Sequence, residues 1–61
     1  MKNELLEVVY IFNNAKGISE LRILADSIEQ RNEWILALCN GDVVGGVKEE
    51  YLRAFYMEVH R

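Results

Sequence analysis

The feature that most limits this chain is its lack of cross-linking residues. Cys39 is the only cysteine and His60 the only histidine among 61 residues. An intramolecular disulfide is therefore impossible, and no set of side chains is left that could hold a structural zinc ion. A chain of this length has room for one hydrophobic core, so we expect a single domain over residues 1–61. Because such small domains have little stability to spare, we also expect self-association into a homo-oligomer.

Composition and charge narrow the function. Apolar residues make up 51% of the chain and charged residues 28%, which is typical of a globular domain. The net charge is −3 and the basic residues are spread along the chain, so broad binding to duplex DNA is disfavoured. No apolar stretch approaches the ~20 residues needed to span a bilayer, and Glu4 and Glu7 interrupt any signal-peptide pattern. We therefore expect no membrane partner and a cytoplasmic location.

The first half of the chain has the pattern of a β-hairpin. Residues 5–12 form a nearly continuous apolar run, which is typical of a buried strand and also compatible with a short helix. Residues 13–17, Asn-Asn-Ala-Lys-Gly, favour a turn because Asn and Gly accept a positive φ at little steric cost. From Ser19 to Asp26, apolar and polar side chains alternate, with Leu24 as the exception. That alternation predicts a strand.

The second half is predicted to contain two further elements joined by a long loop. The polar residues 30–33 form a connection, and residues 34–39 resume the apolar pattern, in which the Cys39 thiol behaves as a small buried hydrophobe. Asn40-Gly41 is a strong hairpin signal. Because Gly45-Gly46 follows, we expect residues 40–48 to form a flexible or extended loop. The last element, about residues 50–59, has the aromatic content of a strand and the charge order of a helix.

These patterns predict a mainly β fold, a small barrel of four to five strands. The alternative is an all-α bundle of three helices. It is supported by the absence of proline and by the helical spacing of Leu21, Leu24, Ile28, Ile35 and Leu38. The middle helix of that bundle would carry Arg31 or Asn32 on its buried stripe, which favours the barrel.

Three segments, in order along the chain, resemble the WYL-like domain family. Residues 12–22 resemble the opening hairpin, with an aromatic strand end, a polar turn containing Gly17 and an arginine, Arg22, in the next strand. Residues 34–39, Trp-Ile-Leu-Ala-Leu-Cys, are similar to the strand that carries the Trp-Tyr-Leu signature, with Ile35 in place of the tyrosine. Residues 53–59, Arg-Ala-Phe-Tyr-Met-Glu-Val, resemble the closing strand.

The resemblance implies an Sm-like or SH3-like small barrel that acts as a regulatory module. WYL-like domains usually belong to bacterial transcription factors or defence systems, where they are thought to sense nucleotides or nucleic-acid fragments. This chain contains no helix-turn-helix pattern, so it is not expected to act by itself as a conventional DNA-binding repressor. We expect a free-standing accessory or phage-type regulator.

The residues themselves indicate binding rather than catalysis. The adjacent acids Glu49-Glu50 fit a solvated surface, and Gly45-Gly46 lacks the Lys-Ser/Thr pair of a P-loop, so we expect no enzyme and no cofactor. Guanidinium groups grip phosphate and an indole offers a stacking surface for a base. The predicted ligand is a nucleotide or short single-stranded nucleic acid, and the candidate ligand-binding residues are Lys16, Arg22, Trp34, Arg53 and Phe55.

Two alternatives accompany this prediction. Trp34 also suits the core of a small domain, and Arg53 also suits a pair with a carboxylate. The second function class is a protein-interaction module that docks on a larger partner through an apolar strip or an edge strand. Tyr51, Phe55 and Tyr56 would supply its aromatic anchors, because aromatic residues concentrate in interface cores.

Overall fold

The chain folds into β-strands, as a computed structural model that describes residues 5–60 shows. The mainly β prediction is confirmed and the three-helix bundle is wrong, because the last segment is a strand preceded by one turn of 3₁₀ helix. In chain order the elements are β1 (Leu6–Asn14), β2 (Gly17–Leu24), β3 (Ser27–Arg31), β4 (Trp34–Cys39), β5 (Asp42–Lys48), η1 (Glu49–Tyr51) and β6 (Leu52–Val59).

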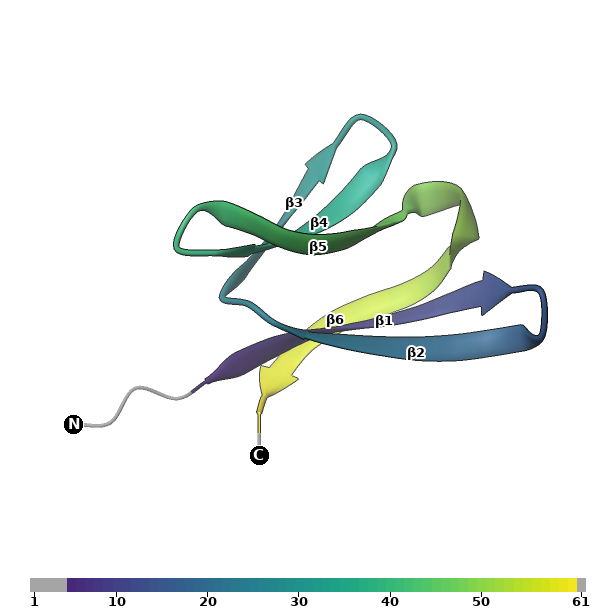
Figure 1. Cartoon of the computed structure of the whole chain (residues 1–61), viewed down its shortest axis with the longest axis horizontal. Coiled ribbons are helices and arrows are strands. Elements are labelled where there is room, and N and C mark those ends of the chain that lie inside the picture. The colour runs from purple at the N-terminus through teal and green to yellow at the C-terminus, as the bar shows by residue number, and fades with distance from the viewer. Residues whose placement is uncertain (1–4, 61) are drawn as a thin grey trace.

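The strands form two small antiparallel sheets, one with the order β2-β1-β6 and the other with the order β3-β4-β5 (Figure 1). A bend at Ala25 and Asp26 carries the chain from one sheet to the other. The Ala25 amide donates to the Leu6 carbonyl of the first sheet at 3.0 Å, and the Asp26 amide donates to the Leu38 carbonyl of the second at 2.8 Å. Six strands appear where four to five were expected, because β3 follows this bend and β5 occupies residues that were predicted to form a loop. The arrangement is compatible with the expected small barrel.

Tight turns close the hairpins where the sequence predicts them. Asn40 and Gly41 both have positive φ, 53° and 86°, as a type I′ hairpin turn requires. The turn predicted over residues 13–17 contracts to Ala15 and Lys16, because Asn14 already pairs with Gly17 across the hairpin. The Asn14 side-chain oxygen accepts a hydrogen bond from the Lys16 amide at 2.8 Å, which fixes the turn locally.

The long loop predicted over residues 40–48 is wrong, because only its first two residues form a turn and the rest is strand β5. The two glycines in β5 serve close packing rather than flexibility. A Cβ atom on Gly45 would collide with the Ile23 side chain of the other sheet. A Cβ atom on Gly46 would lie 3.0 Å from the Ile35 carbonyl oxygen. Glycine inside a strand often marks such a close approach.

The core lies between the two sheets. Val8 and Tyr10 from β1 meet Ile35 and Ala37 from β4, with Val47 beside them. Tyr10 is fully buried, and its hydroxyl donates a hydrogen bond to the Ile35 carbonyl across the core at 2.8 Å. Burial raises the pKa of the Tyr10 phenol, because the low-dielectric interior disfavours its charged form.

Tyr10→Phe removes that bond and leaves the buried Ile35 carbonyl without its side-chain partner. We expect the free energy of unfolding to fall by about 1–3 kcal/mol, the cost of an unsatisfied buried polar group. Tyr56→Phe is the matched control, because Tyr56 is 44% exposed, and it should change stability by less than about 0.5 kcal/mol. Urea unfolding followed by circular dichroism measures both. Equal effects of the two substitutions would contradict this role for Tyr10.

Candidate functional site

An apolar groove lies where the tip of the first hairpin meets the second sheet. Its volume is about 480 Å³. It is lined by Phe12, Asn13 and Asn14 of β1, Leu21 of β2, Trp34 of β4, Gly46, Val47 and Lys48 of β5, and Tyr51 of η1. Pockets lined mainly by apolar and aromatic side chains with a few polar groups are the usual form of a binding site.

Three local features place the aromatic side chains of this groove. Trp34 is the first residue of β4, directly after the Asn32-Glu33 turn, and it is 45% exposed. Tyr51 ends the 3₁₀ turn between β5 and β6 and is 51% exposed. Gly46 offers no side chain beside them, so the groove stays open. Two aromatic rings are therefore available to a ligand rather than absorbed into the core.

The charge around the groove comes mainly from its acidic neighbours. Lys48 is the one lysine in the lining, and its Nζ lies 3.8 Å from the Glu33 carboxylate. Glu49 and Glu50 follow in η1, and both are exposed. The Glu49 amide donates to the Glu33 carbonyl at 2.7 Å, which joins η1 to the turn before Trp34. The groove thus has an apolar floor and one charged lining residue, Lys48, whose charge is offset by Glu33, whereas Glu49 lines a different cavity.

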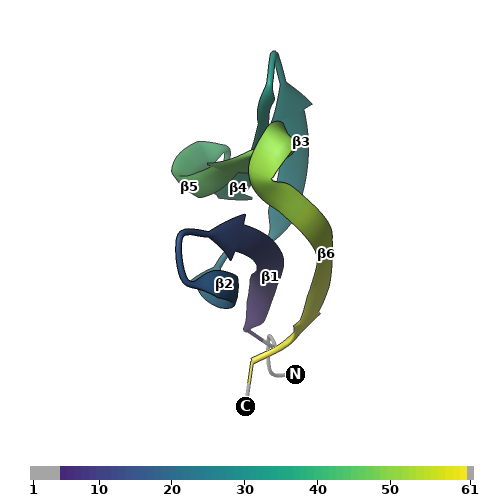
Figure 2. The same cartoon turned by 90° about the vertical axis from the view of Figure 1, so that its right-hand side faces the viewer.

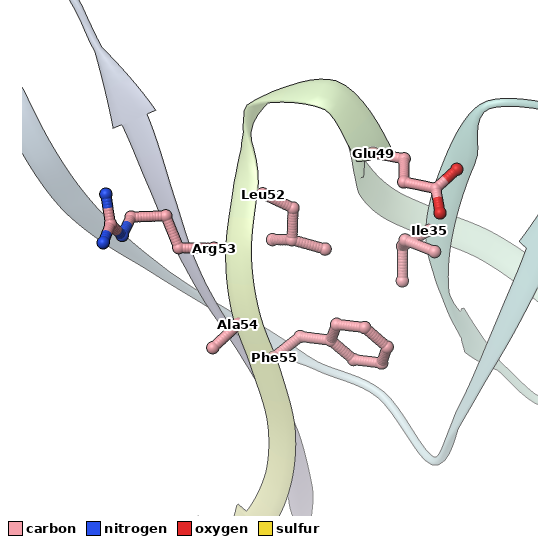
Figure 3. Close-up of a pocket in the computed structure, with 6 residues that line it drawn as sticks. All are labelled: Ile35, Glu49, Leu52, Arg53, Ala54 and Phe55. Carbon is pink, nitrogen blue, oxygen red and sulfur yellow. The ribbon is translucent and has the colours of Figure 1, made fainter.

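A second cavity, of about 400 Å³, lies between β6 and the second sheet (Figure 3). Leu52 and Phe55 face Ile35 there, with Glu49 above them. The Arg53 side chain extends from the other side of β6, away from Leu52 and Phe55. Arg53 therefore borders this cavity through its backbone, and its guanidinium group is aimed elsewhere.

Arg22 is held by a cluster of carboxylates on the first sheet. Its Nη1 donates to Glu7 at 2.6 Å and to Glu58 at 3.0 Å, and its Nε donates to Glu20 at 2.5 Å. Since Arg22 belongs to β2 and Glu58 to β6, the arginine side chain crosses the central strand β1. His60 Nδ1 lies 3.3 Å from the second oxygen of Glu7.

This cluster shifts the titration of both main partners. The hydrogen bond from Arg22 lowers the pKa of Glu7, and burial, which acts in the opposite direction, offsets only part of that shift. The bonds from Glu58, Glu20 and Glu7 raise the pKa of Arg22. The positive charge of Arg22 is therefore paired with the protein's own carboxylates, so little of it is available to attract a phosphate.

The structure separates the five candidate ligand-binding residues. Trp34 lines the groove, Phe55 and Arg53 border the second cavity, and Arg22 lies in the carboxylate cluster. Lys16 is exposed in the hairpin turn. A single site in which Arg22 and Arg53 converge beside Trp34 is not formed, because neither arginine belongs to the groove that Trp34 lines.

The groove also contains residues that the ligand-site prediction missed. Phe12, Leu21 and Lys48 were not identified as ligand-binding residues, and Tyr51 was identified only as an anchor for a protein partner. These residues belong to four different elements. No regular spacing of residue types along the sequence indicates a site of this kind. Trp34, which was predicted to offer a stacking surface for a base, is the one candidate ligand-binding residue that lines the groove.

Comparison of the chain with known protein families, with curated proteins and with solved structures gives no match. Within residues 5–60, no group of three or more His, Cys, Asp or Glu side chains is arranged to hold a metal ion. The same part of the chain contains no helix that is long and apolar enough to cross a membrane.

The depressed pKa of Glu7 predicts a loss of stability in acid. Because the pKa of Glu7 in the folded state lies below its ordinary value of 4.5, the ionised carboxylate stabilises the fold at pH values above 4.5. The contribution is lost as the pH falls through the lower folded-state pKa. Glu7→Gln should therefore lower stability at pH 7 and flatten the decline between about pH 5 and pH 3.

Urea unfolding at a series of pH values tests this prediction. Glu50→Gln is the matched control, because Glu50 is exposed in η1 and has no ion-pair partner within residues 5–60. It should retain the decline of the wild type. A Glu7→Gln profile parallel to that of the wild type would mean that the cluster does not stabilise the fold.

Proposed function

We propose that this chain is a non-catalytic interaction module that holds an extended peptide segment of a partner protein in the groove of Phe12, Leu21, Trp34 and Tyr51. The observation that carries the proposal is the exposure of two aromatic rings beside an open, apolar floor. Aromatic-lined grooves on small barrels bind extended, often proline-containing segments, because rigid rings and a preformed backbone lose little entropy on contact.

Charge favours a peptide over a nucleic acid at this groove. Arg22 is neutralised by three carboxylates, and Lys48 lies near Glu33. The exposed acids Glu49 and Glu50 precede Tyr51 in η1, and this negative charge beside the groove disfavours a phosphate backbone and favours a lysine or arginine. The partner segment is therefore apolar with at least one basic residue beside the apolar part.

Nucleotide or single-stranded nucleic-acid binding is the second candidate function. It is supported by Lys48, which lines the same groove as Trp34 and could meet a phosphate while a base stacks on the indole. The resemblance to the WYL-like family would imply this second function. The resemblance itself stays a prediction, as do the regulatory role and the cytoplasmic location. Salt dependence separates the two functions, because each phosphate contact releases counterions.

Trp34→Ala should weaken peptide binding at least about tenfold, since truncation of a central aromatic anchor costs about 2 kcal/mol or more. Peptides are first selected from a random 12-residue display library on the wild-type protein, and their affinity is then measured by calorimetry. Trp34 is the only tryptophan, so its fluorescence reports directly on coverage of the groove.

Phe55→Ala is the matched control, because Phe55 is an exposed aromatic residue at the other cavity. It should bind the selected peptides as the wild type does. Peptides that bind Trp34→Ala unchanged, or that lose affinity equally with Phe55→Ala, would refute the groove. Labelled oligonucleotides that bind more tightly than every selected peptide, with strong salt dependence, would favour the second function.

A further inference from the structure

The outer face of the sheet β2-β1-β6 is the side turned away from the core. The core side chains of this sheet, such as Val8 and Tyr10, alternate along β1 with Glu7, Val9 and Ile11. Within residues 5–60, the other sheet, β3-β4-β5, covers β2-β1-β6 on its core side (Figure 2). The outer face therefore lacks a covering layer in this part of the chain.

The strand register arranges the outer face as a grid of rows across β2, β1 and β6. The rows, in order along the strands, are Leu24–Glu7–Glu58, then Arg22–Val9–Tyr56, then Glu20–Ile11–Ala54, and last Ile18–Asn13. A bulge in β6 opposite Ile11 and Phe12 leaves Arg53 out of the pairing. Figure 3 shows that the Arg53 side chain points away from the core side, so Arg53 lies on the outer face of β6 just beyond Ala54, between the third and last rows.

Large apolar side chains are exposed at both ends and on both edges of this grid. Leu24 is 49% exposed and Ile18 is 62% exposed, and they lie at opposite ends of β2. Tyr56 on β6 is also exposed. Val9 in the middle is fully buried, because the Arg22 side chain crosses β1 beside it to reach Glu58. An apolar surface with charges set into it is typical of an interface between proteins.

This face is complementary to itself under one particular two-fold rotation. A two-fold axis that runs across the strands between the second and third rows exchanges the first row with the last and the second with the third. Stacked in this way, each β2 lies over the β2 of the other copy and each β6 over the other β6. The accessible opposed residues are Leu24 with Ile18, Arg22 with Glu20 and Tyr56 with Ala54, and Arg53 lies close to Glu58 of the other copy. In the central strand Glu7 is opposed to Asn13 and Val9 to Ile11, but Glu7 and Val9 are buried within their own copy.

The accessible pairs match in chemistry. One is apolar, two carry opposite charges, and one sets a large ring over a small methyl group. The charged groups have bonding capacity left for a second copy: the Arg22 bonds within residues 5–60 use Nε and Nη1, so Nη2 remains available. Arg53 has no carboxylate within ion-pair distance in residues 5–60. A two-fold axis parallel to the strands would instead oppose Glu7 with Glu7.

We propose that two copies of this chain associate through the outer face of β2-β1-β6 about this axis. Two sheets that stack face to face lie about 10 Å apart with interleaved side chains, which suits the apolar pairs described above. A closed two-fold dimer buries the same patch on both partners. The face shares only Asn13 with the Trp34 groove, and the dimer does not depend on the proposed function.

Sedimentation velocity over about 5–500 µM tests the dimer, which should dominate at the upper end of this range. Ile18→Asp places a charge in the apolar pair and should raise the dissociation constant at least tenfold. Val43→Asp is the matched control, because Val43 is 50% exposed on β5 of the other sheet, and it should dimerise as the wild type does. A monomeric wild type, or equal effects of the two substitutions, would overturn the proposal.

A charge exchange tests the direction of the axis. In a homodimer of the Arg53→Glu variant two acids face each other, and in a homodimer of the Glu58→Arg variant two bases face each other. Each variant alone should therefore dimerise more weakly than the wild type. Mixed together, the two variants restore both opposite-charge pairs and should form a heterodimer. Circular dichroism confirms that each variant is folded. A mixture that associates no better than either variant alone would overturn the proposed orientation.

Discussion

Tyr10 spans the interior from the central strand of one sheet to the central strand of the other, and the rest of the fold is arranged around that contact. Its ring fills the space between β1 and β4, and its hydroxyl binds the Ile35 carbonyl. A hydrogen bond at the end of a rigid ring fixes both the distance between the sheets and their relative slide. Because the chain has a single cysteine and therefore no internal disulfide between the sheets, this contact supplies geometric precision that apolar packing alone lacks.

The strand β1 explains why part of the fold could be predicted from the sequence. Residues 5–12 read as a continuous apolar run because β1 is the central strand of its sheet, with Val8 and Tyr10 on one face and Val9 and Ile11 on the other. Local signals also held for the Asn40-Gly41 turn, since its positive φ values need those residue types. The strand β5 was missed because Gly45 and Gly46 owe their presence to Ile23 and Leu36, which are distant in the chain.

The candidate site was less accessible from the sequence than the fold. Arg22 has the chemistry of a phosphate ligand, and only the pairing of β2, β1 and β6 shows that Glu7, Glu20 and Glu58 surround it. The prediction for Trp34 differs, because this residue is the first of β4, where the strand begins beside a turn. Its partners in the groove, Phe12 and Tyr51, come from segments that are far apart in the sequence, so only the folded chain brings them together.

The pairing of β1 with β6 has a consequence for the order in which the chain folds. The hairpins β1-β2, β3-β4 and β4-β5 join neighbouring segments, whereas Leu6 pairs with Val59 near the other end of the chain. The entropy of closing a loop grows with its length, and topologies rich in distant contacts fold slowly. We therefore expect the β1-β6 ladder to form last, and the Arg22 side chain to gain its Glu58 partner only after that closure. Until then, Glu7 and Glu20 alone neutralise the arginine, and the partly folded chain exposes an unpaired edge of β1 to other molecules.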